Sequence, residues 1–384
     1  MDNSKEHLNI AMLGHKRIPS REGGVEIVVE ELCTRMVKLG HRVTCYNRRG
    51  RHTGGREFNA ARLKEYQGVR LRSVCTVDVR GIAAMTSSFF ASIRAAFGRY
   101  DVVHYHAEGP CAMIWLPRLF GKRCVATIHG LDHRRAKWGR FAKWYLRLGG
   151  KCAAKYADAL IVLSEGVQRY FKETYKRDAT LIPNGVSRPD RLEPDLIRKQ
   201  FDLNGGDYVL YLGRLVPEKG LRTLIEAFRR VRTGKKLVIA GGSSDTDGFV
   251  AELKQLAAGD DRILFTGFVQ GALLAELYSN AYLYTLPSEL EGMPLSLMEA
   301  MSYGCCCLTS DIPECADVVV GHAATFRAGD ADDLADKLQK LCDDPALAEC
   351  YRAGAADYIC EKYSWDAAVE RTLALYRGET NGSK

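Results

Sequence analysis

Two carboxylates and the start of a predicted helix give this chain its clearest chemical pattern. Glu291 lies in the loop after the apolar run 280–287, and Glu299 follows with seven residues between them. Pro294 suits the first turn of a helix, and apolar residues then recur at about one turn, at Leu295, Met298 and Met301. The free N–H groups of a helix start favour an anionic ligand, whereas carboxylates would repel a phosphate and better accept hydrogen bonds from hydroxyls. A ligand with both phosphate and hydroxyl groups is a sugar nucleotide.

The spacing of the two carboxylates alone also allows a simpler interpretation. Glu291 could cap the helix N-terminus, and Glu299 could be a solvated surface residue. Taken by itself, this pair favours the structural interpretation, so the choice depends on what the rest of the chain offers.

A second loop carries two cations of the kind that a diphosphate needs. Arg214 and Lys219 lie in the segment 213–220, which follows an apolar strand pattern and precedes a helical one. Arginine offers a planar fork of donors and lysine a compact charge, and both suit phosphate groups. Basic residues in loops are more often simply solvated.

The first half of the chain offers glycines and histidines at the ends of predicted strands, which is where open α/β sheets place their sites. Gly23 and Gly24 lie at a helix entrance, where the backbone can approach a ligand closely, although the dinucleotide pattern G-x-G-x-x-G is absent. His129 lies at a strand-to-loop junction, where a lone histidine is often structural. His104 and His106 either line an acceptor cleft or simply finish their strand.

A basic segment from Arg134 to Lys155 holds eight basic residues and no acidic one. Its apolar positions recur at helical spacing and predict one apolar face, made by Trp138, Phe141, Tyr145 and Leu148. Such a helix can bind a membrane surface, or it can dock its aromatic face on the core with its basic residues in water. Trp138 is also an acceptor-side candidate.

Composition and charge limit the class of protein. The 384 residues suffice for two domains, and 46% apolar content is ordinary for a soluble globular protein. Residues 1–185 carry a net charge of +17 and the remainder −9, which suggests two domains with different partners. No long apolar run and no signal-peptide layout are present, so we expect a cytoplasmic protein.

Neither the cysteines nor the acidic loop residues indicate a metal. The 13 cysteines form no C-x-x-C motif and are expected to act as small hydrophobes in a reducing compartment. Asp245-Thr246-Asp247 matches D-x-D formally, but it lies in a Gly/Ser/Asp stretch typical of turns.

The chain resembles one enzyme family over nearly its full length, and three stretches carry the resemblance most clearly. E-G-M-P-L-S-L-M-E-A-M-S-Y-G, G-R-L-V-P-E-K-G and T-I-H-G-L-D-H are similar to segments of retaining glycosyltransferases of family GT4, of the bacterial polysaccharide-assembly type. The resemblance implies the α/β GT-B fold, with two Rossmann-like domains facing across a cleft. It implies an acceptor-side domain over residues 1–186 and a nucleotide-sugar donor domain over 187–362. Over residues 363–384 it implies a terminal helix that crosses back to the N-terminal domain, followed by a tail. The alternation of strand and helix patterns, with Pro189 and Pro194 near the boundary, independently favours two such domains.

The resemblance also implies roles for the candidate residues. His129 and Glu291 would act at the reacting centre and the donor sugar, and Glu299 would bind the ribose. The other donor-binding positions implied are Gly23, Gly24, Arg214, Lys219, Val269, Met293, Pro294 and Leu295. Cations and a helix N-terminus would then stabilise the diphosphate electrostatically, with no metal or cofactor required.

The predicted activity is transfer of a sugar from a nucleotide diphosphate donor, with retention at the anomeric carbon. The acceptor would be a lipid-linked or polysaccharide-precursor saccharide, such as one on a polyprenyl diphosphate, at the inner face of an anionic membrane. A sugar-nucleotide epimerase or hydrolase of the same fold, or a non-catalytic binding subunit, are the alternatives. No RNA or DNA motif is present, and no nucleic-acid partner is expected.

Overall fold

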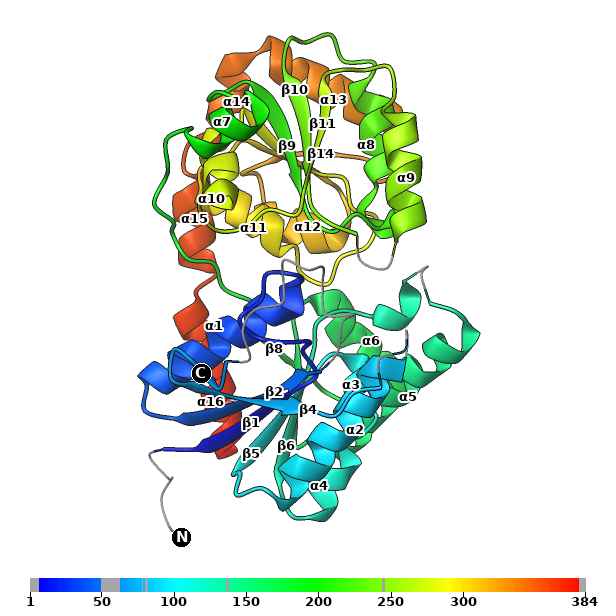
Figure 1. Cartoon of the computed structure of the whole chain (residues 1–384), viewed down its shortest axis with the longest axis vertical. Coiled ribbons are helices and arrows are strands. Elements are labelled where there is room, and N and C mark those ends of the chain that lie inside the picture. The colour runs from blue at the N-terminus through cyan, green and yellow to red at the C-terminus, as the bar shows by residue number, and fades with distance from the viewer. Residues whose placement is uncertain are drawn as a thin grey trace. The chain divides into compact units, whose positions relative to one another are not determined.

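The computed structural model describes residues 7–49, 63–77, 79, 82–135, 138–243 and 246–379. The chain forms two compact units, Met1–Gly185 with Trp365–Lys384, and Val186–Ser364 (Figure 1). Each unit is a parallel sheet covered by helices, and this confirms the two alternating series of strands and helices predicted from the sequence.

The first unit is built on an eight-stranded sheet in the order β3-β4-β2-β1-β5-β6-β7-β8. The pairings are parallel except for β3 with β4. All five residues of β5 are buried, as expected for a parallel strand covered on both faces. The strands are β1 Asn9–Leu13, β2 Arg42–Arg48, β3 Glu65–Tyr66, β4 Val69–Val74, β5 Val102–His106, β6 Arg123–Ile128, β7 Ala159–Val162 and β8 Thr180–Leu181.

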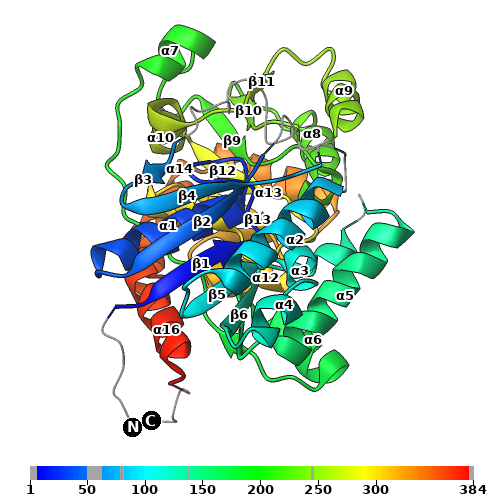
Figure 2. The same cartoon turned by 60° about the horizontal axis from the view of Figure 1, so that its bottom comes forward.

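Helices cover both faces of this sheet, and they include the last helix of the chain. α1 packs against α16 on one face, while α2, α3, α4 and α5 cover the other (Figure 2). The helices are α1 Gly24–Lys38, α2 Ile82–Phe97, α3 Glu108–Cys111, α4 Trp115–Leu119, the 3-10 turn η2 Asp132–Arg134, α5 Arg140–Tyr156, α6 Glu165–Tyr175 and α16 Trp365–Arg377.

The second unit is built on a six-stranded, fully parallel sheet in the order β11-β10-β9-β12-β13-β14. Its strands are β9 Tyr208–Leu212, β10 Lys236–Ala240, β11 Ile263–Gly267, β12 Leu283–Leu286, β13 Cys307–Ser310 and β14 Ala324–Phe326. Its helices are α7 Leu196–Phe201, the 3-10 turn η3 Pro217–Lys219, α8 Leu221–Phe228, α9 Asp247–Leu256, α10 Gly271–Asn280, α11 Leu295–Ser302, α12 Pro313–Val319, α13 Ala331–Asp343, α14 Pro345–Arg352 and α15 Ala355–Lys362.

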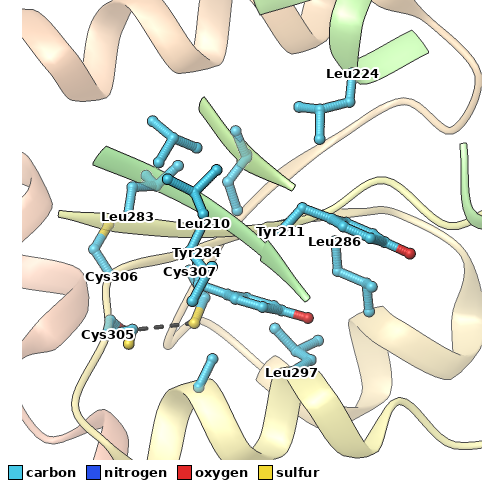
Figure 3. Close-up of a cluster of buried hydrophobic side chains, with 14 of the residues drawn as sticks. Leu210, Tyr211, Leu224, Leu283, Tyr284, Leu286, Leu297, Cys305, Cys306 and Cys307 are labelled. Carbon is cyan, nitrogen blue, oxygen red and sulfur yellow. Dashed lines mark hydrogen bonds between the residues drawn. The ribbon is translucent and has the colours of Figure 1, made fainter. Parts of the chain in front are cut away.

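The core of the second unit explains the run of three consecutive cysteines. Cys305, Cys306 and Cys307 are buried among leucine and tyrosine side chains of β9 and β12 (Figure 3). Burial raises the pKa of the Cys305 and Cys306 thiols to about 12, so both stay protonated. These cysteines act as small apolar residues of the core.

Two predicted elements differ from the structure for local reasons. Residues 110–120 are predicted from the sequence to form one helix. The structure instead has two short helices, α3 and α4, because Pro117 lacks the N–H group and its ring crowds the carbonyl four residues earlier. The apolar run 280–287 predicts a strand from residue 280, but β12 begins at Leu283, because Asn280 ends helix α10.

Candidate active site

The two predicted carboxylates lie near the start of α11 and are held by different partners. Glu291 Oε1 accepts a hydrogen bond of 2.6 Å from the Ser288 hydroxyl. Glu299 Oε2 accepts one of 3.2 Å from Tyr278, whose ring stacks on Tyr303. Each carboxylate is therefore oriented by a neighbouring hydroxyl, so the interpretation of Glu299 as a merely solvated residue does not hold.

The helix that begins beside Glu291 starts one residue later than predicted. α11 begins at Leu295, so Pro294 occupies the capping position and not the first turn. Met293 and Leu295 are partly buried and pack against the core of the second unit. The start of an eight-residue helix thus lies in the same segment as Glu291.

The loop from β9 to α8 brings one predicted cation directly to this segment. Lys219 Nζ forms an ion pair with Glu291 Oε1, and their side chains are only 13% and 9% exposed. Arg214 precedes the 3-10 turn η3, and its carbonyl accepts a hydrogen bond of 3.0 Å from Tyr211. Lys219, predicted to bind phosphate, and Glu291, predicted to bind sugar hydroxyls, are therefore in direct contact.

Backbone contacts hold that loop on the segment after β12. The Glu289 N–H donates to the Glu218 carbonyl over 3.0 Å. Gly220 has a left-handed φ of +66°, and a Cβ there would lie 1.9 Å from the Pro287 carbonyl oxygen. Only glycine permits this approach without strain, and it fixes where Lys219 lies.

Val269 follows β11, and its side chain is buried in the core of the second unit. At this donor-binding position implied by the resemblance, only the backbone of Val269 is therefore available to a ligand.

Helix α1 in the first unit begins at the predicted glycine pair. Gly24 is its first residue, and Gly23 is extended, with a φ of −165°. A buried carboxylate occupies this turn, since Glu26 Oε1 accepts a hydrogen bond of 2.9 Å from the Lys16 N–H. A Cβ on Gly23 would lie 2.8 Å from the other oxygen of Glu26, so the glycine leaves room for that carboxylate.

The predicted histidines gather at the carboxyl ends of β5 and β6. His129 Nε2 lies 3.0 Å from His106 Nδ1. His104 is bonded on both ring nitrogens, to Tyr376 at 2.5 Å and to Thr127 at 2.7 Å. His104 and His106 are fully buried, which favours the interpretation that they finish the strand and support His129 over one in which they line a cleft.

The segment after His129 is anchored by a buried acid. Glu108 accepts hydrogen bonds from the His133 backbone over 3.1 Å and from its Nδ1 over 2.9 Å. Burial raises the pKa of Glu108, while the bonds to His133 oppose that shift. Glu108 and Tyr278 could not be predicted from the sequence, because their partners lie on other elements. Ser288 lies three residues before Glu291 in the same loop, and this short spacing was a signal that could have found it.

The basic segment forms α5, but its predicted apolar face does not dock on the core as a whole. The helix begins at Arg140, so Trp138 precedes it and is half-buried. Tyr145 is buried, whereas Phe141 and Trp144 are 66% and 57% exposed and pack on each other at 5.8 Å. The helix therefore docks one aromatic residue on the core and presents two to solvent.

Buried histidines make the first unit sensitive to acid. Burial lowers the pKa of His15 to about 4 and that of His104 to about 3. Between those values and the unfolded value of about 6.5, only the unfolded chain binds the proton, so stability falls as the pH falls. We expect each to lower the free energy of unfolding by about 2 kcal/mol between about pH 7 and about pH 5.

Urea unfolding of the wild type and of His15→Asn at both pH values measures this effect. Buried acids with raised pKa, such as Glu108, act in the opposite direction, so the difference between the two proteins isolates His15. An identical pH dependence in both proteins would contradict the prediction.

The described residues contain no group of three or more His, Cys, Asp or Glu side chains that could hold a metal ion. Asp245 of the D-x-D match lies outside those residues, and Asp247 begins α9. No helix in the described part of the chain is both long and apolar enough to cross a membrane.

Two protein-family models and several known proteins match this chain. The family model described as Glycosyltransferase Family 4 matches residues 22–188, and that described as Glycosyl transferases group 1 matches residues 194–358. A phosphatidyl-myo-inositol mannosyltransferase of Mycobacterium leprae is 29% identical over 307 residues, which cover 75% of this chain and 76% of that protein.

Solved structures give the same fold over nearly the whole chain. A sucrose-phosphate synthase from Thermosynechococcus elongatus superposes with a TM-score of 0.80 at 22% identity, covering 97% of this chain and 98% of that one. HepE from Anabaena, in complex with UDP and glucose, gives 0.80 at 16% identity, covering 97% and 100%.

Proposed function

We propose that this chain transfers a sugar from a nucleotide-sugar donor with retention of the anomeric configuration and without a metal. The chain belongs to the family 4 glycosyltransferases, which have the GT-B fold and use nucleotide-sugar donors. The observation that carries the proposal is that Lys219, from the loop after β9, forms an ion pair with Glu291, which lies in the segment that begins α11. A departing diphosphate needs positive charge placed before the reaction, and a lysine with a helix start can supply it.

Each donor-side residue has a distinct role in this proposal. Lys219 and Arg214 bind the diphosphate oxygens, and Glu291 accepts hydrogen bonds from the sugar hydroxyls. Glu299, oriented by Tyr278, accepts those of the ribose. The Lys219–Glu291 ion pair keeps both side chains in place before the donor binds.

A panel of nucleotide sugars tests the reaction, with release of nucleoside diphosphate and formation of glycosylated product followed separately. The proposal expects coupled release and transfer, a product of the donor's anomeric configuration by NMR, and full activity in EDTA. Nucleotide release without product would favour a hydrolase or epimerase, inversion would contradict retention, and no turnover with any donor would favour a non-catalytic subunit.

We also propose a lipid-linked acceptor and a contact with the inner face of an anionic membrane. Residues 82–156, which include α2 to α5, hold thirteen lysines and arginines against three acidic residues. Large apolar side chains protrude from the same helices, with Phe97 71%, Leu119 73% and Phe141 66% exposed. Cations with protruding aromatic residues are typical of helices that lie on anionic lipid.

Vesicle binding measures this contact. We expect Phe141→Ser with Trp144→Ser to bind vesicles of equal parts phosphatidylcholine and phosphatidylglycerol at least about tenfold more weakly. Neutralising Arg140, Arg147 and Lys151, all exposed, should weaken binding further and reduce its salt dependence.

The matched control is Val320→Ser, which removes a 58% exposed apolar side chain from the second unit and should bind like the wild type. Equal vesicle binding by all variants would contradict the proposed membrane contact but would not bear on the proposed sugar transfer.

A further inference from the structure

A hydrogen bond between two imidazoles sets a constraint on His129. His106 Nδ1 and His129 Nε2 are 3.0 Å apart, so one of them carries the shared proton and the other accepts it. Burial lowers the pKa of both rings, that of His129 to about 4, so both are neutral near pH 7. In a neutral imidazole only one nitrogen carries a proton, and the shared bond therefore couples the tautomers of the two residues.

The surroundings of His106 decide between the two arrangements. Its ring is fully buried and lies 4.2 Å from that of His104, which is itself fixed by Tyr376 and Thr127. Within the described residues, His106 Nε2 is buried and has no hydrogen-bond partner. A buried N–H group without a hydrogen-bond partner is rarer in proteins than a buried acceptor without one. His106 Nε2 is therefore expected to be unprotonated.

We infer that His106 carries its proton on Nδ1 and donates it to Nε2 of His129, so that His129 carries its own proton on Nδ1. His129 Nδ1 has no partner among the described residues, and His129 is only half-buried, whereas His106 is fully buried. His129 thus offers an N–H donor to a bound molecule. His106 is a positioning residue that fixes this polarity.

The chemical consequence concerns the ligand atom that His129 can bind. A donor at Nδ1 recognises an acceptor, such as a sugar hydroxyl oxygen or a diphosphate oxygen, and in this state it cannot remove a proton from an acceptor hydroxyl. The ligand class rests on the proposed function, but the tautomer does not, since it is set in the protein alone.

Nitrogen NMR of the protein with ¹⁵N-labelled histidine, without any substrate, tests the assignment. Two-bond couplings distinguish a ring protonated at Nδ1 from one protonated at Nε2, and the His129→Asn variant identifies the signals of His129. We expect the Nδ1–H tautomer of His129 in the wild type. A wild-type His129 protonated at Nε2 would overturn the inference.

Two variants of His106 separate positioning from packing. His106→Phe keeps an aromatic ring without its nitrogens, so the His129 spectrum should change to a mixture of tautomers, and kcat should fall about tenfold with a smaller change in donor KM. His106→Asn places an amide donor near the position of Nδ1 and should restore the tautomer and most of kcat.

The control His322→Asn lies in the second unit and should leave the His129 signals and the turnover unchanged. An unchanged His129 spectrum in a folded His106→Phe would also overturn the inference. If the NMR result holds and no donor is turned over, the proposed function fails while this inference stands.

Discussion

Lys219→Met should lower kcat/KM for the nucleotide-sugar donor about 100- to 1,000-fold. The reason is electrostatic, because a cation placed beside a departing diphosphate acts in a site that excludes much of the water, where one donor is worth several kcal/mol. The side chain of Lys219 is only 13% exposed, so after the substitution little water could enter to stabilise the negative charge of the diphosphate. Initial rates over a range of donor concentrations measure the loss.

The same substitution has a second effect that must be separated from the first. Glu291 loses its ion-pair partner while 9% exposed, and an uncompensated buried charge costs about 3 kcal/mol of stability. The double variant Lys219→Met with Glu291→Gln removes that charge and should recover most of the free energy of unfolding. The Ser288 hydroxyl can still donate to the remaining amide oxygen.

The activity of the two variants shows whether Lys219 binds phosphate or only stabilises the fold. The double variant should stay at least as inactive as Lys219→Met, because it lacks the cation and also the carboxylate proposed for the sugar. Near-normal turnover of either variant would remove Lys219 from the phosphate role.

The places of the proposed donor-side residues in the fold could be predicted from the sequence, because these residues lie in short local patterns. Arg214 and Lys219 share one loop, and Glu291 and Glu299 flank one helix start. These patterns reflect strand-to-helix turns, whose chemistry depends on neighbours a few residues apart. The ion pair that joins the two patterns spans 72 positions, and no local periodicity records such a distance.

The histidine cluster shows the same limit more strongly. His104 and His129 could each be singled out at a strand end, but their supports come from other elements. Tyr376 reaches His104 from 272 positions away, through α16, and Glu108 fixes the segment after His129 from 25 positions upstream. The apolar spacing near Trp138 likewise predicted one continuous face, but Trp138 lies before the helix. Of the two aromatic residues one turn apart on that face, Tyr145 is buried against the core and Phe141 is exposed.

Gly220→Ala should strongly destabilise the second unit, because the glycine combines a left-handed φ with a close backbone contact. Its φ of +66° alone costs about 1 kcal/mol for a residue with a Cβ, and the new methyl group would lie 1.9 Å from the Pro287 carbonyl oxygen. Relief of that clash must move the 213–220 loop away from the segment after β12. We expect a loss of about 3 kcal/mol or more in the free energy of unfolding of the second unit.

Gly206→Ala is the matched control for this substitution. Gly206 has a similar φ of +80°, belongs to the same unit, and has no atom within 4 Å of the place where a Cβ would lie, so only the backbone strain of about 1 kcal/mol remains. Because Lys219 directly precedes Gly220, the displaced loop should also lower donor turnover about 100-fold, whereas Gly206→Ala should turn over donor like the wild type. Equal unfolding free energies and rates for the two variants would mean that the contact with Pro287 does not hold Lys219 in place.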